Sequence, residues 1–194
     1  MRSEEGKRAG DAGLVILAKK GEAGAFEKLY DRHAEGVARA LSSYAGPDRE
    51  AVNDLTQEVF CRVIASLSSY RPLRPFAHWL YTITLNVGRN YVRARSREIP
   101  VDPGDLEGTA SGGRPPGDLS REALAVRLVR FASHLPEHMR EVVSLRIGGG
   151  LPYGEIGEML GIPEGTARSR MHYAMKALRE KAERKERTDR RDRR

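Results

Sequence analysis

The side chains best placed for chemistry with a ligand lie near the C-terminus, in the stretch from Leu151 to Glu180. Helical periodicity puts a polar set on one side of a predicted helix there, opposite an apolar stripe: Arg168, Ser169, His172 and Lys176. Arginine can bond guanine through two N–H groups, small hydroxyls can bond bases, and lysine neutralises phosphates. The set therefore predicts contact with the major groove of DNA. Periodicity alone also fits a solvated helix of an ordinary bundle.

Two predicted helices flank a glycine turn in this stretch. The first begins after Pro152 and ends at Gly161, and the second begins near Pro163, where a fixed φ and a missing N–H cost little. The predicted apolar faces are Ile156, Met159 and Leu160 on the first helix, and Ala167, Met171, Ala174, Met175 and Leu178 on the second. This layout is typical of a helix-turn-helix whose second helix enters the major groove.

A second polar group lies on a helix predicted from about Arg49 to Leu67, with Asp48 as its N-cap. One side carries Asp54, Gln57, Glu58 and Cys61, and the other carries a predicted core stripe of Val52, Leu55, Val59, Val63 and Ile64. Acidic and amide groups at this spacing suit either a solvated face or a docking surface for a basic partner.

A third group is basic and aromatic. Arg89, Arg93 and Arg97 follow one another at four-residue spacing, after a helix predicted around Trp79. Aromatic rings stack bases and arginines neutralise phosphates, so the group favours single-stranded nucleic acid. Trp79 equally suits the role of the main core aromatic of its domain.

Composition narrows the function further. The 194 residues carry a formal net charge of +7, which favours a polyanionic partner. The single cysteine, Cys61, excludes an internal disulfide and a zinc site built from cysteines. The acidic residues lie on helix faces or in a predicted linker, which argues against a magnesium-dependent enzyme. No apolar run is long enough to span a membrane and the N-terminus is unlike a signal peptide, so we expect a soluble cytoplasmic protein without metal or cofactor.

Helical periodicity in the segments, interrupted by stretches rich in proline and glycine, predicts an all-α fold of two small helical domains. They cover residues 14–98 and 120–182, joined by an acidic, Pro/Gly-rich linker at 99–119, with a disordered segment at 1–13 and a charged tail at 183–194. One helix is expected to carry Leu124, Leu128, Phe131 and Leu135. Interior glycines, Gly154 and Gly157 among them, are expected to loosen the first helix of the motif.

Three segments resemble bacterial extracytoplasmic-function (ECF) sigma factors. LPYGEIGEML with GIPEGTARSR is similar to the DNA-reading part of region 4, with Pro163, Gly165, Thr166, Ser169 and Arg170 on the motif positions. NDLTQEVFCRVIASL resembles the region 2 segment that docks on the clamp helices of the polymerase β′ subunit. PFAHWLYTITLNVGRNYVRARSR resembles the segment that melts the promoter and reads the minus-10 element.

The resemblance implies a non-enzymatic protein that binds core RNA polymerase, through the β′ clamp helices and the β flap, and directs it to promoter DNA. It assigns core binding to Asp54, Leu55, Gln57, Glu58 and Phe60. Minus-10 contacts fall on Trp79, Asn86, Arg89, Asn90, Arg93, Arg95 and Arg97, and minus-35 contacts on Thr166, Arg168, Ser169, Arg170, His172 and Lys176.

The resemblance also implies that a base-capturing loop begins at Asn86, although Asn86 would equally serve to end its helix. An anti-sigma factor is an expected partner. The linker either threads the RNA-exit path or acts as an inert tether. The alternatives are a freestanding helix-turn-helix regulator, which leaves the two region 2 segments unexplained, and a DNA-processing enzyme.

Overall fold

The computed structural model describes residues 10–22, 24–71, 73–98, 129 and 131–191, and the regular structure among these residues is entirely helical, with no strand. The N-terminal half (residues 10–98) consists of α2 (Asp11–Lys19), α3 (Ala25–Ala45), α4 (Arg49–Ser66), the 3-10 turn η1 (Leu67–Ser69) and α5 (Phe76–Glu98). The C-terminal half (residues 129–191) consists of η2 (Ala132–His134), α7 (Glu137–Val143), the π-turn η3 (Ser144–Gly148), α8 (Tyr153–Leu160) and α9 (Glu164–Arg191). The expected all-α fold is confirmed.

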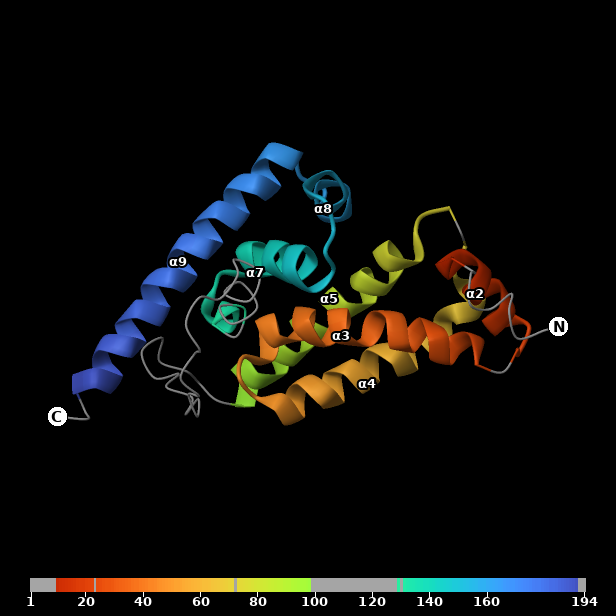
Figure 1. The fold of residues 1–194 in the computed structure, drawn as a ribbon, viewed down its shortest axis with the longest axis horizontal. Coiled ribbons are helices and arrows are strands. Elements are labelled where there is room, and N and C mark those ends of the chain that lie inside the picture. The colour runs from red at the N-terminus through yellow and green to blue at the C-terminus, as the bar shows by residue number, and fades with distance from the viewer. Residues whose placement is uncertain (1–9, 23, 72, 99–128, 130, 192–194) are drawn as a thin grey trace.

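Helices α3, α4 and α5 lie lengthwise against one another, and α2 packs at one end of them (Figure 1). Asp48 caps α4 as predicted, since its Oδ1 accepts a hydrogen bond of 3.0 Å from the N–H of Ala51. The apolar faces of α2, α3, α4 and α5 form the core of the N-terminal half. Its fully buried members include Leu14, Leu29, Val37, Leu41, Val59, Val63 and Leu80.

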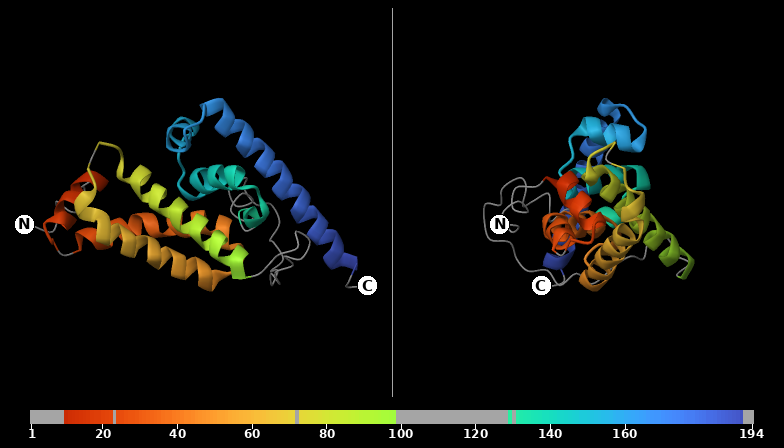
Figure 2. Two further views of the ribbon diagram at one scale, coloured as in Figure 1. Left: turned by 180° about the vertical axis from the view of Figure 1, so that it is seen from behind. Right: turned by 90° about the vertical axis from the view of Figure 1, so that its right-hand side faces the viewer.

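The C-terminal half packs on the other end of α3 and α5, with α9 as the long outer helix (Figures 1 and 2). A second core lies here, and both halves contribute to it. Ala40, Tyr44, Tyr81 and Leu85 come from α3 and α5, and they join the buried side chains of α7, η3, α8 and α9. The two halves are therefore continuous through a shared apolar core.

Glycine allows the two halves to approach this closely. A Cβ at Gly148 would lie 2.6 Å from the backbone N of Ala40, and one at Gly36 would lie 3.0 Å from the carbonyl oxygen of Gly148. Backbone atoms cannot rotate away as a side chain can, so these positions exclude larger residues at the observed spacing. Two hydrogen bonds of 3.3 Å cross the same contact, from the Ser144 hydroxyl to the Ala40 carbonyl and from the Tyr81 hydroxyl to the Gly148 carbonyl.

Several expected details differ from the structure. The first described helix begins at Asp11, not Leu14. Ile64 is 56% exposed, because the core stripe of α4 continues from Val59 through Val63 to Leu67 at four-residue spacing and Phe60 is buried as well. Phe131 lies in a turn and Leu135 follows the 3-10 turn η2, so the single helix expected to carry both is wrong.

The charged tail is also helical as far as Arg191. Glu180 and Glu183 each precede an arginine by four residues, a spacing that supports a helix. The linker at 99–119, the positions of Leu124 and Leu128, and residues 1–9 and 192–194 lie outside the described residues.

The glycines of α8 have distinct surroundings. Gly157 is buried within α8 and packs against the turn that follows it, since a Cβ there would lie 2.7 Å from the carbonyl oxygen of Ile162. Gly154 faces open space apart from the carboxylate of Glu164, whose Oε2 would be 3.7 Å from its Cβ. Gly157 thus allows the chain to turn closely from α8 into α9. The sequence predicted only that this glycine would loosen α8, and not this packing role.

Candidate nucleic-acid and polymerase interfaces

The helix-turn-helix is formed by α8 and α9. Gly161 ends α8 in the left-handed conformation at φ +65°, and the N–H of Ile162 bonds back to the Gly157 carbonyl at 2.9 Å. The Pro163 carbonyl then accepts the N–H groups of Thr166 and Ala167 and starts α9. Both helix ends are where the sequence predicted them.

The apolar stripe of α9 is buried as predicted, with Ala167, Ala174 and Leu178 essentially inaccessible to solvent. The opposite face is exposed and carries Arg168, Ser169, His172 and Lys176, while Thr166 and Arg170 are half-buried beside it. Tyr173, 58% exposed and in edge contact with His172, lies next to this face. Sequence reasoning missed Tyr173, although a large aromatic outside the apolar stripe was the available signal.

The Arg168 side chain is held by two neighbours. Its Nε donates to Oε1 of Glu164 at 3.1 Å, one helical turn earlier, and its guanidinium lies over the ring of Tyr153 at 5.2 Å. The guanidinium of Arg146 lies over the same ring at 5.0 Å. Tyr153 and Arg146 were not predicted to belong to this surface.

The predicted docking residues of α4 divide into two groups. Asp54 and Gln57 are exposed, and Glu58 is partly exposed in an ion pair of 2.5 Å with Arg62. Leu55 and Phe60 are buried, with the Phe60 ring 4.6 Å from that of Tyr30. In this conformation only the polar members of the set are open to a partner, and the apolar members position the helix.

The basic residues of α5 also divide. Asn86, Asn90, Arg93 and Arg97 are exposed on one face of the helix. Arg95 is exposed on the opposite side, where its Nη1 donates to the Tyr91 hydroxyl at 2.8 Å. Arg89 instead turns toward the C-terminal half, where its Nε donates to Oε1 of Glu141 at 2.7 Å and lies 3.2 Å from Oε1 of Glu137. Burial opposes the charge of Arg89, but the hydrogen bond and the charge of Glu141 outweigh it and raise the pKa of the guanidinium.

The expected loop after Asn86 is absent. Helix α5 continues without a break from Phe76 to Glu98, because residues 87–98 include no proline and the buried Gly88 accommodates the ring of Tyr44. Asn86 lies in the middle of the helix, where its Oδ1 accepts a hydrogen bond of 3.2 Å from Arg89. Neither the loop nor the helix end expected at Asn86 is observed.

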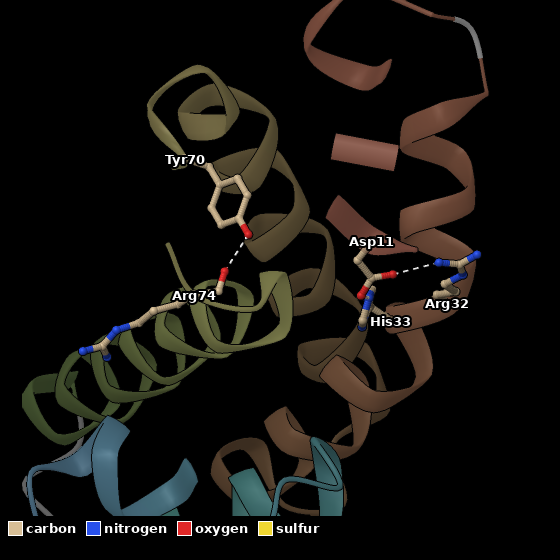
Figure 3. A network of polar contacts seen from close by, with 5 residues as sticks. All are labelled: Asp11, Arg32, His33, Tyr70 and Arg74. Atoms are coloured by element: carbon tan, nitrogen blue, oxygen red, sulfur yellow. Dashed lines mark hydrogen bonds and ion pairs between the residues drawn. The ribbon is translucent and has the colours of Figure 1, made fainter. Parts of the chain in front are cut away.

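An irregular segment precedes α5. Here the Tyr70 hydroxyl donates to the Arg74 carbonyl at 2.8 Å (Figure 3). Nearby, Asp11 of α2 bonds Arg32 and His33 of α3 at 2.9 and 2.8 Å. Trp79, half-buried, packs against the rings of Tyr70 and Phe76, with centroids 5.1 and 5.8 Å away. The rings of Tyr70 and Phe76 thus hold Trp79 against the core of the N-terminal half, while the Asp11 contacts join α2 to α3.

Two buried tyrosines line the contact between the halves. Burial raises the pKa of Tyr81 to about 12, and the nearby Arg39 offsets this only in part. Burial, followed by the charge of Glu141, raises the pKa of Tyr44 further above its ordinary value. Both hydroxyls are therefore strongly biased to the neutral form.

Within the part of the chain that the structure describes, no group of three or more His, Cys, Asp or Glu side chains is placed to hold a metal ion. None of the helices described is long and apolar enough to cross a bilayer.

Comparisons with known proteins place both halves. Residues 29–98 match sigma-70 region 2, and residues 132–180 match sigma-70 region 4. The chain is 35% identical to the ECF RNA polymerase sigma-E factor of Escherichia coli K12 over 180 residues, covering 88% of this chain and 93% of the relative. Identity to the sigma-E factor of Haemophilus influenzae is 32% over 180 residues, covering 88% of this chain and 94% of the relative.

Solved structures agree. The chain is similar to CnrH in its complex with the cytosolic domain of CnrY, with a TM-score of 0.60, 25% identity, and coverage of 88% of this chain and 95% of that one. It shares its fold with RpoE of Bartonella quintana, solved with the anti-sigma factor NepR, at a TM-score of 0.60 and 20% identity over 81% of this chain and 96% of that one. A freestanding regulator is not favoured, since the region 2 half matches as well as the region 4 half. The chain belongs to the ECF group of sigma-70 factors, which bind core RNA polymerase and direct it to promoter DNA.

Proposed function

We propose that three surfaces of this chain divide the work of transcription initiation. The exposed polar side of α4 docks on the β′ clamp helices, the exposed side of α5 holds the separated minus-10 strand, and α9 reads the minus-35 element while its domain contacts the β flap. The observation that carries the proposal is the polar face of α9, since Arg168, Ser169 and His172 are open to solvent directly opposite a buried apolar stripe.

The proposed strand-binding surface consists of Asn86, Asn90, Arg93 and Arg97, which are exposed on one face of α5, with Arg95 exposed on the other side of the same helix. Guanidinium groups neutralise phosphates, and the asparagine amides offer both a donor and an acceptor to base edges. Arg89 can join them only after it exchanges the carboxylates of Glu137 and Glu141 for a phosphate. Separation of the two halves is therefore part of the proposed mechanism.

The chain itself is proposed to catalyse no reaction, because phosphoryl transfer belongs to the polymerase. It would act in the cytoplasm, on the nucleoid when bound to polymerase. CnrH and RpoE of B. quintana were solved with partners, an anti-sigma factor in the second case, which supports a similar inhibitor for this chain.

Reconstitution with core RNA polymerase from E. coli tests the proposal. Run-off transcription on fragments of the source genome, followed by mapping of start sites, should give a shared pair of promoter elements. The double variant Asp54→Arg, Glu58→Arg should fold normally by circular dichroism and fail to co-purify with core polymerase. The matched control Glu35→Arg, at an exposed acidic residue of α3, should co-purify as the unmodified chain does.

Two outcomes would count against this division of labour. Normal co-purification of the folded double variant would remove α4 as the docking surface. Transcription starting without any shared upstream sequence would remove α9 as the minus-35 reader.

A further inference from the structure

The aromatic ring of Tyr153 lies at the junction of three elements of the C-terminal half. Tyr153 is the first residue of α8 and is half-buried. Its ring faces the guanidinium of Arg168 from α9 at 5.2 Å and that of Arg146 from η3 at 5.0 Å. One ring thus touches two cations, one of which belongs to the proposed base-reading set.

The ring is held by its own helix and by its surroundings. Pro152 precedes it at the start of α8, and Leu151 before that is buried. Arg146 is tied to the same segment, since its Nη1 donates to the Leu151 carbonyl at 2.9 Å. The position of Tyr153 is therefore set by the backbone at the start of α8.

Arg168 has two partners, and they use different parts of its guanidinium. Glu164 accepts from Nε and Nη2, which are N–H groups at the edge of the plane. The Tyr153 ring makes a cation–π contact instead, and this leaves N–H donors unused. Guanine needs two of those edge donors for its O6 and N7. Tyr153 can therefore remain in contact while Arg168 reads a base, whereas Glu164 competes for donors.

We propose that Tyr153 is a positioning residue for sequence recognition: it orders the Arg168 guanidinium for base reading and so sets the discrimination at one base pair. The inference rests on the proposed minus-35 role of α9. Arg168 is long and its side chain is 64% exposed, so without the ring it would sample many rotamers in the free protein. Fixing one rotamer on binding DNA would then cost free energy. An exposed ion pair such as Arg168–Glu164 contributes little order of its own.

The experiment uses holoenzyme reconstituted from the full chain and E. coli core polymerase. Selection from a randomised duplex library defines the preferred upstream sequence of the unmodified holoenzyme, and Arg168→Ala identifies the base pair whose preference is lost. Affinity is then measured for the preferred duplex and for its three single-base variants at that position.

Tyr153→Phe keeps the ring face and should retain the preference. Tyr153→Leu removes the ring and should lower discrimination at that base pair about two- to fivefold, the range of an exposed cation–π contact. In an Arg168→Ala background, Tyr153→Leu should cause no further loss at that position. The matched control Phe131→Leu removes a half-buried ring of the same half that contacts no guanidinium among the described contacts, and should leave this discrimination unchanged.

Thermal unfolding shows whether the Leu variant is folded. If it is not, Tyr153→Met, which keeps apolar length without a ring, replaces it in the same assay. The inference is overturned if the ringless variant weakens all four duplexes equally, or if Tyr153→Phe behaves as Tyr153→Leu does. Failure of the unmodified holoenzyme to select any upstream sequence would instead overturn the proposed minus-35 role.

Discussion

At the scale of single residues, Gly154 and Gly157 show how neighbouring glycines of one helix can differ in purpose. Gly157→Ala should destabilise the protein, because its Cβ would lie 2.7 Å from the Ile162 carbonyl, a backbone atom that cannot move alone. Gly154→Ala should stabilise it by up to about 0.5 kcal/mol, because the position has room and alanine favours helix. Urea unfolding followed by circular dichroism measures both changes in the free energy of unfolding.

Gly165→Ala is the control for this pair, since a Cβ there meets nothing within 4 Å in the first turn of α9. It should behave as Gly154→Ala does. Equal stability changes for Gly154→Ala and Gly157→Ala would show that the turn does not need the close approach seen here.

At the scale of elements, the sequence predicted helices best where punctuation and periodicity agreed. Pro152, Gly161 and Pro163 bound α8 and α9, and Asp48 caps α4, all as expected. The sequence did not predict that α5 would run past Asn86, since the loop came from the resemblance and no glycine or proline pair marks one. Nor did it separate Phe60, which is buried, from Ile64, which is exposed, because both lie near the border of one stripe.

A prediction for α5 follows from the exposure of Asn86 in mid-helix. If its amide binds the separated strand, Asn86→Ala should reduce open-complex formation and leave binding of core polymerase and of upstream duplex unchanged. Opening costs a few kcal/mol of unpairing and unstacking, so the loss should shrink on a template with a pre-melted bubble. Permanganate footprinting of unpaired thymines on duplex and bubble templates measures the effect.

Asn86 also accepts a hydrogen bond from Arg89, so a structural effect has to be separated from strand binding. Asn86→Asp keeps the acceptor for Arg89 and loses the amide donor. It should resemble Asn86→Ala if the amide reads a base. Equal loss on duplex and bubble templates would favour a structural role.

At the scale of the whole molecule, the shared core between the halves was beyond sequence reasoning. Its residues come from α3, α5 and the C-terminal half, and helical periodicity reports only that each face is apolar. In the sequence alone, Gly36 and Gly148 would be taken as residues that weaken a helix, whereas in the fold they allow the contact. Only the folded chain shows them opposite Tyr81 and Ala40.

The buried tyrosines at this contact predict a dependence on alkaline pH. The pKa of Tyr81 is about 12 in the folded chain against an ordinary value of 10, so its contribution to stability is complete below pH 10 and is lost as the pH rises from 10 to 12. The pKa of Tyr44 is raised as well, so its contribution to the stability of the fold also falls as the pH rises. Tyr81→Phe should therefore flatten the fall in the free energy of unfolding across this window, measured by urea unfolding at several pH values. An unchanged slope would mean that Tyr81 is not buried in solution.

The contact itself can be opened by a single methyl group. In Gly148→Ala the new Cβ would lie 2.5–2.6 Å from the Cβ, Cα and N of Ala40, so the halves must separate to relieve it. The hydrogen bonds from Ser144 to Ala40 and from Tyr81 to Gly148, both 3.3 Å, would then lengthen and weaken. Arg89 would be drawn away from Glu141 by the same movement.

Small-angle X-ray scattering of the full chain should show a larger radius of gyration for Gly148→Ala with an unchanged helical signal in circular dichroism, while Gly165→Ala keeps the dimensions of the unmodified chain. A radius that does not change in Gly148→Ala would mean that the halves do not meet through this glycine in solution.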